Sequence, residues 1–211
     1  MKQTSTIGLD LAKSLFQIHG VTSEGHVVVR RQLRRGEVLS FFGKLAPCLV
    51  GMEACGGAHY WAREIAALGH DVRLIPPAYV KPYVKRGKTD AADAEAICEA
   101  VTRPTMRFAP VKSAGQQASA MVLKTRDLLV RQRSQTINAF RAHLGELGIV
   151  TGTGVAKVAS LVAIVRDADD DRLPTAARLA LTSLADQIDR LTAEVEALER
   201  QLVAAVRCDE E

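Results

Sequence analysis

Residues 5–33, STIGLDLAKSLFQIHGVTSEGHVVVRRQL, determine the topology of this chain. The runs 5–11, 15–21 and 26–33 are apolar or loosely alternating, and each predicts a strand. Links of three and four residues separate them. Such short links permit only antiparallel pairing, because a parallel crossover needs about a dozen residues or more. The stretch therefore predicts a three-stranded antiparallel meander.

The residues that follow alternate between helical and strand patterns. Helical spacing covers 37–45 and 58–68, and short apolar runs at 48–52 and 71–75 predict two more strands. The resulting order, β-β-β-α-β-α-β, is a meander followed by right-handed parallel crossovers. We therefore expect an α/β fold with a mixed five-stranded sheet, ordered 3-2-1-4-5 and flanked by helices. This pattern is typical of the ribonuclease-H-like fold.

The second half of the chain is expected to be helical. A helix capped by Thr89 or Asp90 is predicted to run to about residue 103, and helices are also predicted at 114–147 and 155–165. The last predicted helix, 175–206, has apolar residues at the spacing of heptads. These are Leu181, Leu184, Ile188, Leu191, Val195, Leu198, Leu202 and Ala205.

That heptad pattern predicts a coiled coil, packed either on the earlier long helix or on another subunit. The second alternative makes the chain a homo-oligomer, a dimer or higher, whereas an intramolecular helical hairpin would use the same residues. We expect two domains: a sheet domain over residues 1–112 and a long-helix, coiled-coil region over residues 113–211.

Composition is that of an ordinary globular protein, with 47% hydrophobic and 25% charged residues. The start of the chain has no signal-peptide pattern, and no apolar run approaches the roughly 18 residues of a membrane span. We therefore expect a cytoplasmic location without membrane contact. The 4 cysteines and 5 histidines show no zinc-ligand spacing, so the cysteines are expected to be reduced thiols.

Positive charge is concentrated in the middle of the chain. Residues 78–145 hold 12 Lys/Arg against 5 Asp/Glu, whereas residues 166–211 hold 6 against 12. Within the middle part, AYVKPYVKRGK (78–88) interleaves basic residues with Tyr79 and Tyr83, a combination that suits a nucleic-acid backbone and its bases. An ordinary solvated loop is the alternative. The residues expected to contact nucleic acid are Lys81, Lys85, Arg86, Lys88, Lys124 and Arg131.

Four acidic residues are candidates for a metal site. Asp90 and Asp93 lie three residues apart in KTDAADA (88–94) and therefore share one helical face. Asp10 and Glu53 each end an apolar strand. Alone, these acids could simply cap helices or end turns, since acids stabilise helix N-termini. In a 3-2-1-4-5 sheet, however, strands one and four are neighbours, and the helix that follows strand five can lie against both.

Convergent carboxylates without histidine or cysteine prefer hard cations such as Mg²⁺ or Mn²⁺. Two such ions, about 3.5–4 Å apart, would support in-line displacement at phosphorus. The expected chemistry is therefore metal-dependent processing of a phosphodiester.

Three motifs, GLDLAK (8–13), GMEACGG (51–57) and KTDAADA (88–94), together resemble the DEDD transposases of bacterial insertion sequences, in the insertion sequence 110 family. The resemblance covers roughly residues 5–150 and continues into the long helices. It implies a RuvC-like N-terminal domain with Asp10, Glu53, Asp90 and Asp93 as the catalytic, metal-binding tetrad. It also implies DNA strand cleavage and exchange during transposition, with an element-encoded guide RNA as a partner.

Members of that family carry a C-terminal domain with a nucleophilic serine, and no serine of this chain matches it. On this basis the chain is expected to be a truncated or shortened relative that binds metal and nucleic acid without completing recombination alone. Two other functions remain open: a stand-alone nuclease for branched DNA, and a non-catalytic nucleic-acid-binding module. An actin-like ATPase is disfavoured. Residues 10–13 loosely resemble its first phosphate-binding hairpin, but the second hairpin needs an Asp-x-Gly turn, and the sequence contains none.

Overall fold

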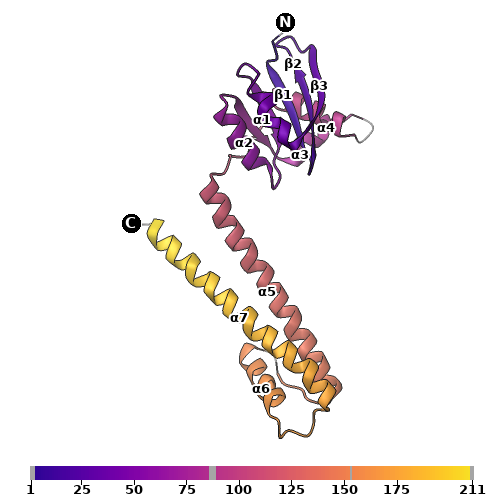
Figure 1. The fold of residues 1–211 in the computed structure, drawn as a ribbon, viewed down its shortest axis with the longest axis vertical. Coiled ribbons are helices and arrows are strands. Elements are labelled where there is room, and N and C mark those ends of the chain that lie inside the picture. Colours follow the sequence, from indigo (N-terminus) through magenta and orange to yellow (C-terminus); the bar gives the residue numbers. More distant parts are fainter. Residues whose placement is uncertain (1–2, 86–88, 153, 210–211) are drawn as a thin grey trace. The chain divides into compact units, whose positions relative to one another are not determined.

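The computed structural model describes residues 3–85, 89–152 and 154–209, and it divides into two compact units, Met1–Gln117 and Ala118–Glu211 (Figure 1). The first unit contains a five-stranded sheet ordered β3-β2-β1-β4-β5. Neighbours β1, β2 and β3 pair antiparallel, and β4 is parallel to both β1 and β5. The strands are β1 (Thr6–Leu11), β2 (Leu15–Val21), β3 (Val27–Arg34), β4 (Leu49–Glu53) and β5 (Asp71–Ile75). The predicted α/β, ribonuclease-H-like sheet is confirmed.

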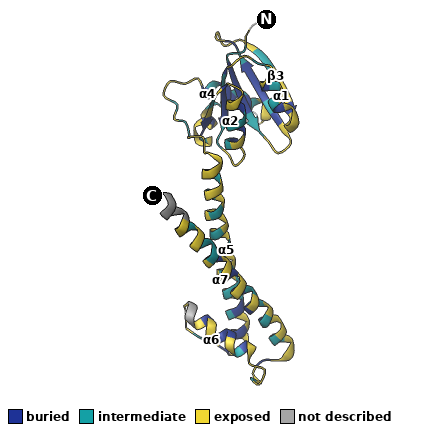
Figure 2. Cartoon of the chain, turned by 60° about the vertical axis from the view of Figure 1, so that its left-hand side comes forward, coloured by how far each residue is buried: buried dark blue, intermediate teal, exposed yellow. Residues whose placement is uncertain are grey.

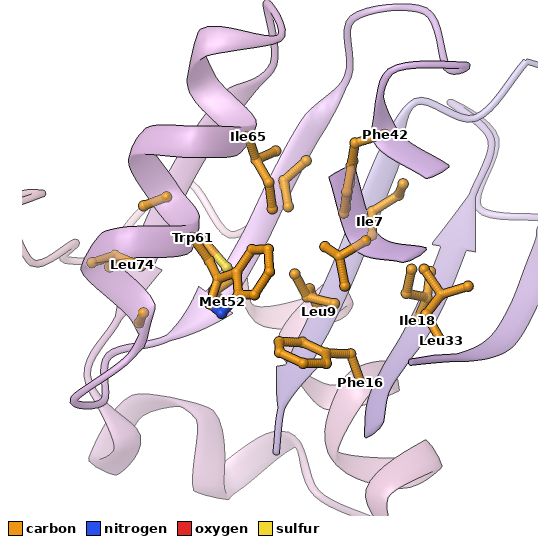
Figure 3. Packing of buried hydrophobic residues seen from close by; sticks show 14 of the residues in the cluster. Ile7, Leu9, Phe16, Ile18, Leu33, Phe42, Met52, Trp61, Ile65 and Leu74 are labelled. Atoms are coloured by element: carbon orange, nitrogen blue, oxygen red, sulfur yellow. The ribbon is translucent and has the colours of Figure 1, made fainter. Parts of the chain in front are cut away.

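Helices cover both faces of this sheet. Within the described part of the chain, six helical segments precede the long helices: η1 (Arg35–Glu37) with α1 (Val38–Phe42), α2 (Ala58–Ala67), α3 (Pro77–Val80) with η2 (Lys81–Tyr83), and α4 (Asp90–Ala100). One face packs on α1 and α2 through fully buried side chains that include Ile7, Leu9 and Phe42 (Figure 3). Buried residues predominate in β1, β2 and β4, whereas most residues of β3 are exposed or intermediate (Figure 2).

Helix α4 packs on the opposite face and approaches the strands unusually closely. A Cβ added to Gly8 would lie 2.8 Å from the Cβ of Cys98, and one added to Gly51 would lie 2.7 Å from the Cβ of Val101. These two glycines therefore allow α4 to rest almost on the backbone of β1 and β4. Its first turn comes to lie beside the ends of those two strands.

The segment before α4 is more regular than its sequence suggested. Where an irregular, basic and aromatic stretch was expected, the chain forms α3 and η2. Pro77 occupies the first turn of α3, where its missing N–H leaves no hydrogen bond unmade. Val80 is buried, and the half-buried Tyr83 ring lies 5.6 Å from the Arg103 guanidinium. Burial of Val80 and packing of Tyr83 thus stabilise a conformation that local pattern alone did not reveal.

A buried histidine joins three parts of the first core. The Nδ1 atom of His70 accepts a hydrogen bond of 3.2 Å from the Cys48 amide, and its Nε2 lies 3.1 Å from the Phe42 carbonyl. With Nδ1 as acceptor, Nε2 carries the proton and donates to Phe42. A neutral imidazole thus satisfies two buried backbone groups.

Replacing His70 with leucine is expected to lower the free energy of unfolding by about 2–4 kcal/mol, because it leaves both backbone groups buried without partners. Urea denaturation of the purified chain measures this. His26→Leu is the matched control, since the His26 side chain is 61% exposed. Equal stabilities of the two variants would show that the His70 hydrogen bonds contribute nothing.

The second unit is helical, with α5 (Ala114–Glu146, which begins in the first unit), α6 (Val155–Arg166) and α7 (Thr175–Asp209). Buried residues from all three helices form one cluster, in which Phe140 and Leu144 of α5 join Leu181 and Ile188 of α7 (Figure 2). Further along, Arg126 of α5 pairs with Glu199 of α7 at 2.5 Å. The heptad face of α7 thus contacts helices of its own chain, which is the intramolecular alternative.

Two further expectations concern the cysteines and membrane-spanning helices. Cys48, Cys55 and Cys98 are free thiols. Among the helices of residues 3–85, 89–152 and 154–209, none combines the length and apolar character needed to cross a bilayer.

Candidate metal centre

The sheet brings two acids side by side. Residues Thr6–Leu9 of β1 pair in parallel with Leu49–Met52 of β4, so the next residues along the two strands, Asp10 and Glu53, are neighbours. Both side chains are half-buried. Because parallel strands end at the same edge, the short apolar runs that form β1 and β4 place both carboxylates at one edge of the sheet.

Helix α4 adds two more acids. The Thr89 hydroxyl caps the helix by accepting a hydrogen bond of 3.3 Å from the Ala92 amide, which starts the helix just before Asp90 and Asp93. One carboxylate oxygen from each of Asp10, Asp90 and Asp93 lies within 4.8 Å of the others. Three acids, separated by up to 83 positions in the sequence, thus converge on one spot.

Glu53 belongs to the same cavity. A cavity of about 680 Å³ contains Asp10, Glu53 and Asp93 in its wall, and the exposed Asp90 lies at its side beside Asp10 and Asp93. Its remaining wall comes from α3, η2 and the residues that follow: Pro77, Val80, Lys81, Val84 and Lys85. All four sequence-predicted acids therefore line or border one cavity, although Glu53 is not in the group of three whose oxygens lie within 4.8 Å of one another.

The electrostatics show unbalanced negative charge. Burial, followed by the charges of Asp93, Asp90 and Glu53, raises the pKa of Asp10 from 3.8 to about 6. Burial and the charge of Asp93 also raise the pKa of Glu53. A site that disfavours its own ionised carboxylates is stabilised by a bound cation. Carboxylates close enough to share one ion, with no nitrogen or sulfur ligand among them, suit a hard divalent cation.

Neutralising Asp10 is expected to stabilise the cation-free protein. Since the folded protein holds the Asp10 proton up to a pKa of about 6, against 3.8 when unfolded, stability falls as pH rises through this window and stays low above it. At pH about 7.5, Asp10→Asn should therefore raise the free energy of unfolding by about 1–2 kcal/mol, after allowing for partial solvent screening.

Urea denaturation in chelator at two pH values measures this effect. The advantage of Asp10→Asn should shrink at pH about 4.5, where the native carboxyl is protonated. Asp127→Asn, on the exposed face of α5, is the control and should change little. A stability of the variant equal to that of the unchanged chain at both pH values would contradict the assigned charge repulsion.

The basic residues predicted to contact nucleic acid fall into three groups. Lys81 and Lys85 line the carboxylate cavity. Lys124 and Arg131 are exposed on α5. Arg86 and Lys88 lie outside the described residues.

An ion-pair network beside the cavity was missed by the sequence analysis. Glu95 of α4 accepts from Lys85 at 2.5 Å and from Arg30 of β3 at 3.4 Å. Its partners lie 10 and 65 residues away, so no local spacing signals the contact.

His59 has a structural role, as its Nδ1 accepts a hydrogen bond of 3.1 Å from the Lys112 amide.

The first unit is a ribonuclease-H-like domain with clustered carboxylates at one edge of its sheet. Residues 7–149 match the family of DEDD transposases of insertion sequence 110, whose description is "Transposase". This range includes all four acids. The chain belongs to this family.

Relatives support the same assignment. A probable family 20 transposase of Pseudomonas aeruginosa is 53% identical over 97% of this chain and 61% of its own length. A putative transposase of Sinorhizobium fredii is 43% identical over 100% of this chain and 54% of its own length. The transposase for insertion sequence element IS1328 of Yersinia enterocolitica is 38% identical over 100% and 62%. The chain thus spans slightly more than half the length of these relatives.

Proposed function

We propose that this chain supplies the metal-dependent site of a transposase that cleaves and exchanges DNA strands, with Asp10, Glu53, Asp90 and Asp93 as its catalytic carboxylates. The observation that carries the proposal is the convergence of these acids from β1, β4 and α4. Membership of the transposase family and the relatives' names support DNA as the substrate.

The site residues fit Mg²⁺ or Mn²⁺, and we propose two such ions. The fit rests on an all-carboxylate set of donors and on the raised pKa of Asp10, which marks charge that the protein alone leaves unbalanced. When bound, such cations activate the attacking oxygen and neutralise charge on the phosphodiester. Asp10, Glu53 and Asp93 would hold the ions inside the cavity, and Asp90 would contact them from its exposed side.

Basic residues around the cavity are proposed to bind the DNA backbone. Lys81 and Lys85 line the cavity wall beside the carboxylates. The Lys81 ammonium group would bind a phosphate there, and Lys85 would do so by exchanging its ion pair with Glu95 for one with the phosphate. Arg86 and Lys88 belong to the same segment, and Lys124 and Arg131 would bind nucleic acid along α5. Such contacts predict that affinity falls steeply with salt.

The wider assembly is also part of the proposal. We assign residues 1–112 to the RuvC-like catalytic domain and residues 113–211 to a helical region that supports assembly into a dimer or a higher oligomer. An element-encoded guide RNA is the proposed partner that brings target DNA to the site. Light scattering of the chain, with and without RNA, tests the oligomeric state.

The direct test of the proposed function is incubation of the purified chain with branched DNA and Mn²⁺. Cleavage that is lost in Asp90→Ala, but retained in the surface control Asp127→Ala, supports the proposal. Salt-sensitive binding without cleavage would instead indicate a non-catalytic binding module, and absence of binding would contradict a nucleic-acid function for this chain.

A further inference from the structure

The face of the sheet that carries Asp10 is only partly covered by α4. Strand register places Gly8 of β1 opposite His19 of β2, which in turn lies opposite Arg30 of β3. Gly8 lies directly beneath α4, and the Arg30 side chain reaches Glu95 on that helix. This row of residues therefore marks the α4 face of the sheet.

The next row on the same face leads away from the candidate metal centre. Asp10 lies opposite Gln17, and Gln17 lies opposite Gln32. Side chains two residues apart on a strand share a face, so both amides project on the same side as Arg30. Gln17 is half-buried and Gln32 is exposed. This row therefore runs from Asp10, through the two amide side chains, to the β3 edge of the sheet.

The following row ends the surface at that edge. Leu15 of β2 is 43% exposed and lies opposite the exposed Arg34 of β3. We call Leu15, Gln17, Gln32 and Arg34 the β2–β3 strip. Neighbouring strands are about 4.8 Å apart, so Gln32 lies roughly 10 Å from Asp10 across the sheet. One strand of nucleic acid can therefore contact the carboxylate site and the strip together.

The charge of these strands selects the kind of partner. Asp10 is the single acid in the sequences of β1, β2 and β3, whereas β3 contains three arginines. Amide and guanidinium groups are common donors to phosphate oxygens, and an exposed aliphatic side chain can pack on a sugar or base. A polyanion therefore fits the strip. Because this surface of amide and guanidinium donors is continuous with the proposed phosphodiester site, DNA is its best-matched occupant.

The arginines around β3 have different roles. Arg30 pairs with Glu95, and the Arg35 guanidinium lies 5.0 Å over the Trp61 ring. Within the described part of the chain, Arg31 and Arg34 take part in no side-chain ion pair. Both lie in the second half of β3, but their side chains project from opposite faces of the sheet. Arg31 lies opposite Ile18, and the Ile18 side chain is fully buried in the core beneath α1 and α2.

We infer that the β2–β3 strip binds the backbone of a DNA strand as it enters or leaves the carboxylate site, with Gln17, Gln32 and Arg34 as donors to its phosphates. This inference rests on the proposed function, because it assumes that the carboxylate site acts on DNA. It assigns a direction to the substrate: the strand crosses β1, β2 and β3 toward the free edge.

Fluorescence anisotropy with a labelled single-stranded DNA, in Ca²⁺ to prevent cleavage, tests the inference on the whole chain. Arg34→Gln should weaken binding about fivefold or more and reduce the slope of log affinity against log salt by roughly 0.7, the value for one phosphate contact on a single strand. Arg31→Gln removes the same charge from the opposite face and should change affinity less than about twofold. Thermal melting checks that both variants are folded.

Equal loss of affinity in Arg34→Gln and Arg31→Gln would overturn the inference, because it would show attraction by net charge without a preferred face. Tighter binding of RNA, weakened by Arg34→Gln while DNA binding is unchanged, would overturn DNA as the occupant. The two proposals fail separately. Cleavage that depends on Asp90 with no difference between the arginine variants refutes the strip alone, whereas the expected difference without any Mn²⁺-dependent cleavage refutes the proposed function.

Discussion

Asp93→Asn is expected to weaken Mn²⁺ binding on the order of 100-fold, since outer partners of a metal ligand already account for 10–100-fold. DNA cleavage should fall about 1,000-fold or more, because a bound metal contributes several kcal/mol to stabilisation of the transition state. Asp93 is singled out because its charge affects the pKa of both other half-buried acids. Its charge contributes to the raised pKa of Asp10 and to that of Glu53.

Asp90→Asn is the informative comparison for Asp93→Asn. Asp90 is exposed and is not part of the cavity wall, so its loss should weaken Mn²⁺ binding less than the loss of Asp93. Isothermal titration calorimetry gives both affinities, with Asp127→Asn as the surface control. Unchanged Mn²⁺ affinity in Asp93→Asn would remove this residue from the site.

Gly8→Ala is expected to lower the free energy of unfolding by about 2–3 kcal/mol, the upper range for overpacking. The added Cβ would meet the backbone of α4 at Ala94 and Cys98, and neither backbone nor Cβ can turn aside as a flexible side chain would. Relief requires α4 to move away from β1. Because α4 carries Asp90 and Asp93, Mn²⁺ affinity should fall together with stability.

Gly36→Ala provides the matched control for Gly8→Ala, since a Cβ at Gly36 meets no atom within 4 Å and its backbone needs no positive φ. Urea denaturation and Mn²⁺ titration of both variants measure the effect. If Gly8→Ala matched Gly36→Ala in both measurements, close packing of α4 on β1 would not be what positions the two acids.

Much of the fold follows from local sequence. The links between the first three strands are too short for anything but a meander, and Gly69, with a φ of 93°, ends α2 as a helix stop signal predicts. The meeting of Asp10 and Glu53 was also predictable, because each directly ends an apolar strand and the crossover rule makes those strands neighbours.

Other features depend on contacts that no local pattern reveals. The helices α3 and η2 form where an irregular segment was expected, because burial of Val80 and the contact of Tyr83 with Arg103 are tertiary. The pairing of Glu95 with Lys85 and Arg30 is likewise non-local. The heptads of α7 suit an intramolecular or an intermolecular partner equally, so packing on α5 and α6 had to be observed.

The central claim is that Asp10, Glu53, Asp90 and Asp93 share divalent cations in one cavity. The most direct measurement is anomalous diffraction from a crystal of this chain soaked in Mn²⁺. The account predicts a strong anomalous peak within bonding distance, about 2.0–2.2 Å, of carboxylate oxygens from Asp10 and Asp93, with Glu53 or Asp90 completing the site. Peaks confined to other surface acids, with the cavity empty at saturating Mn²⁺, would contradict it.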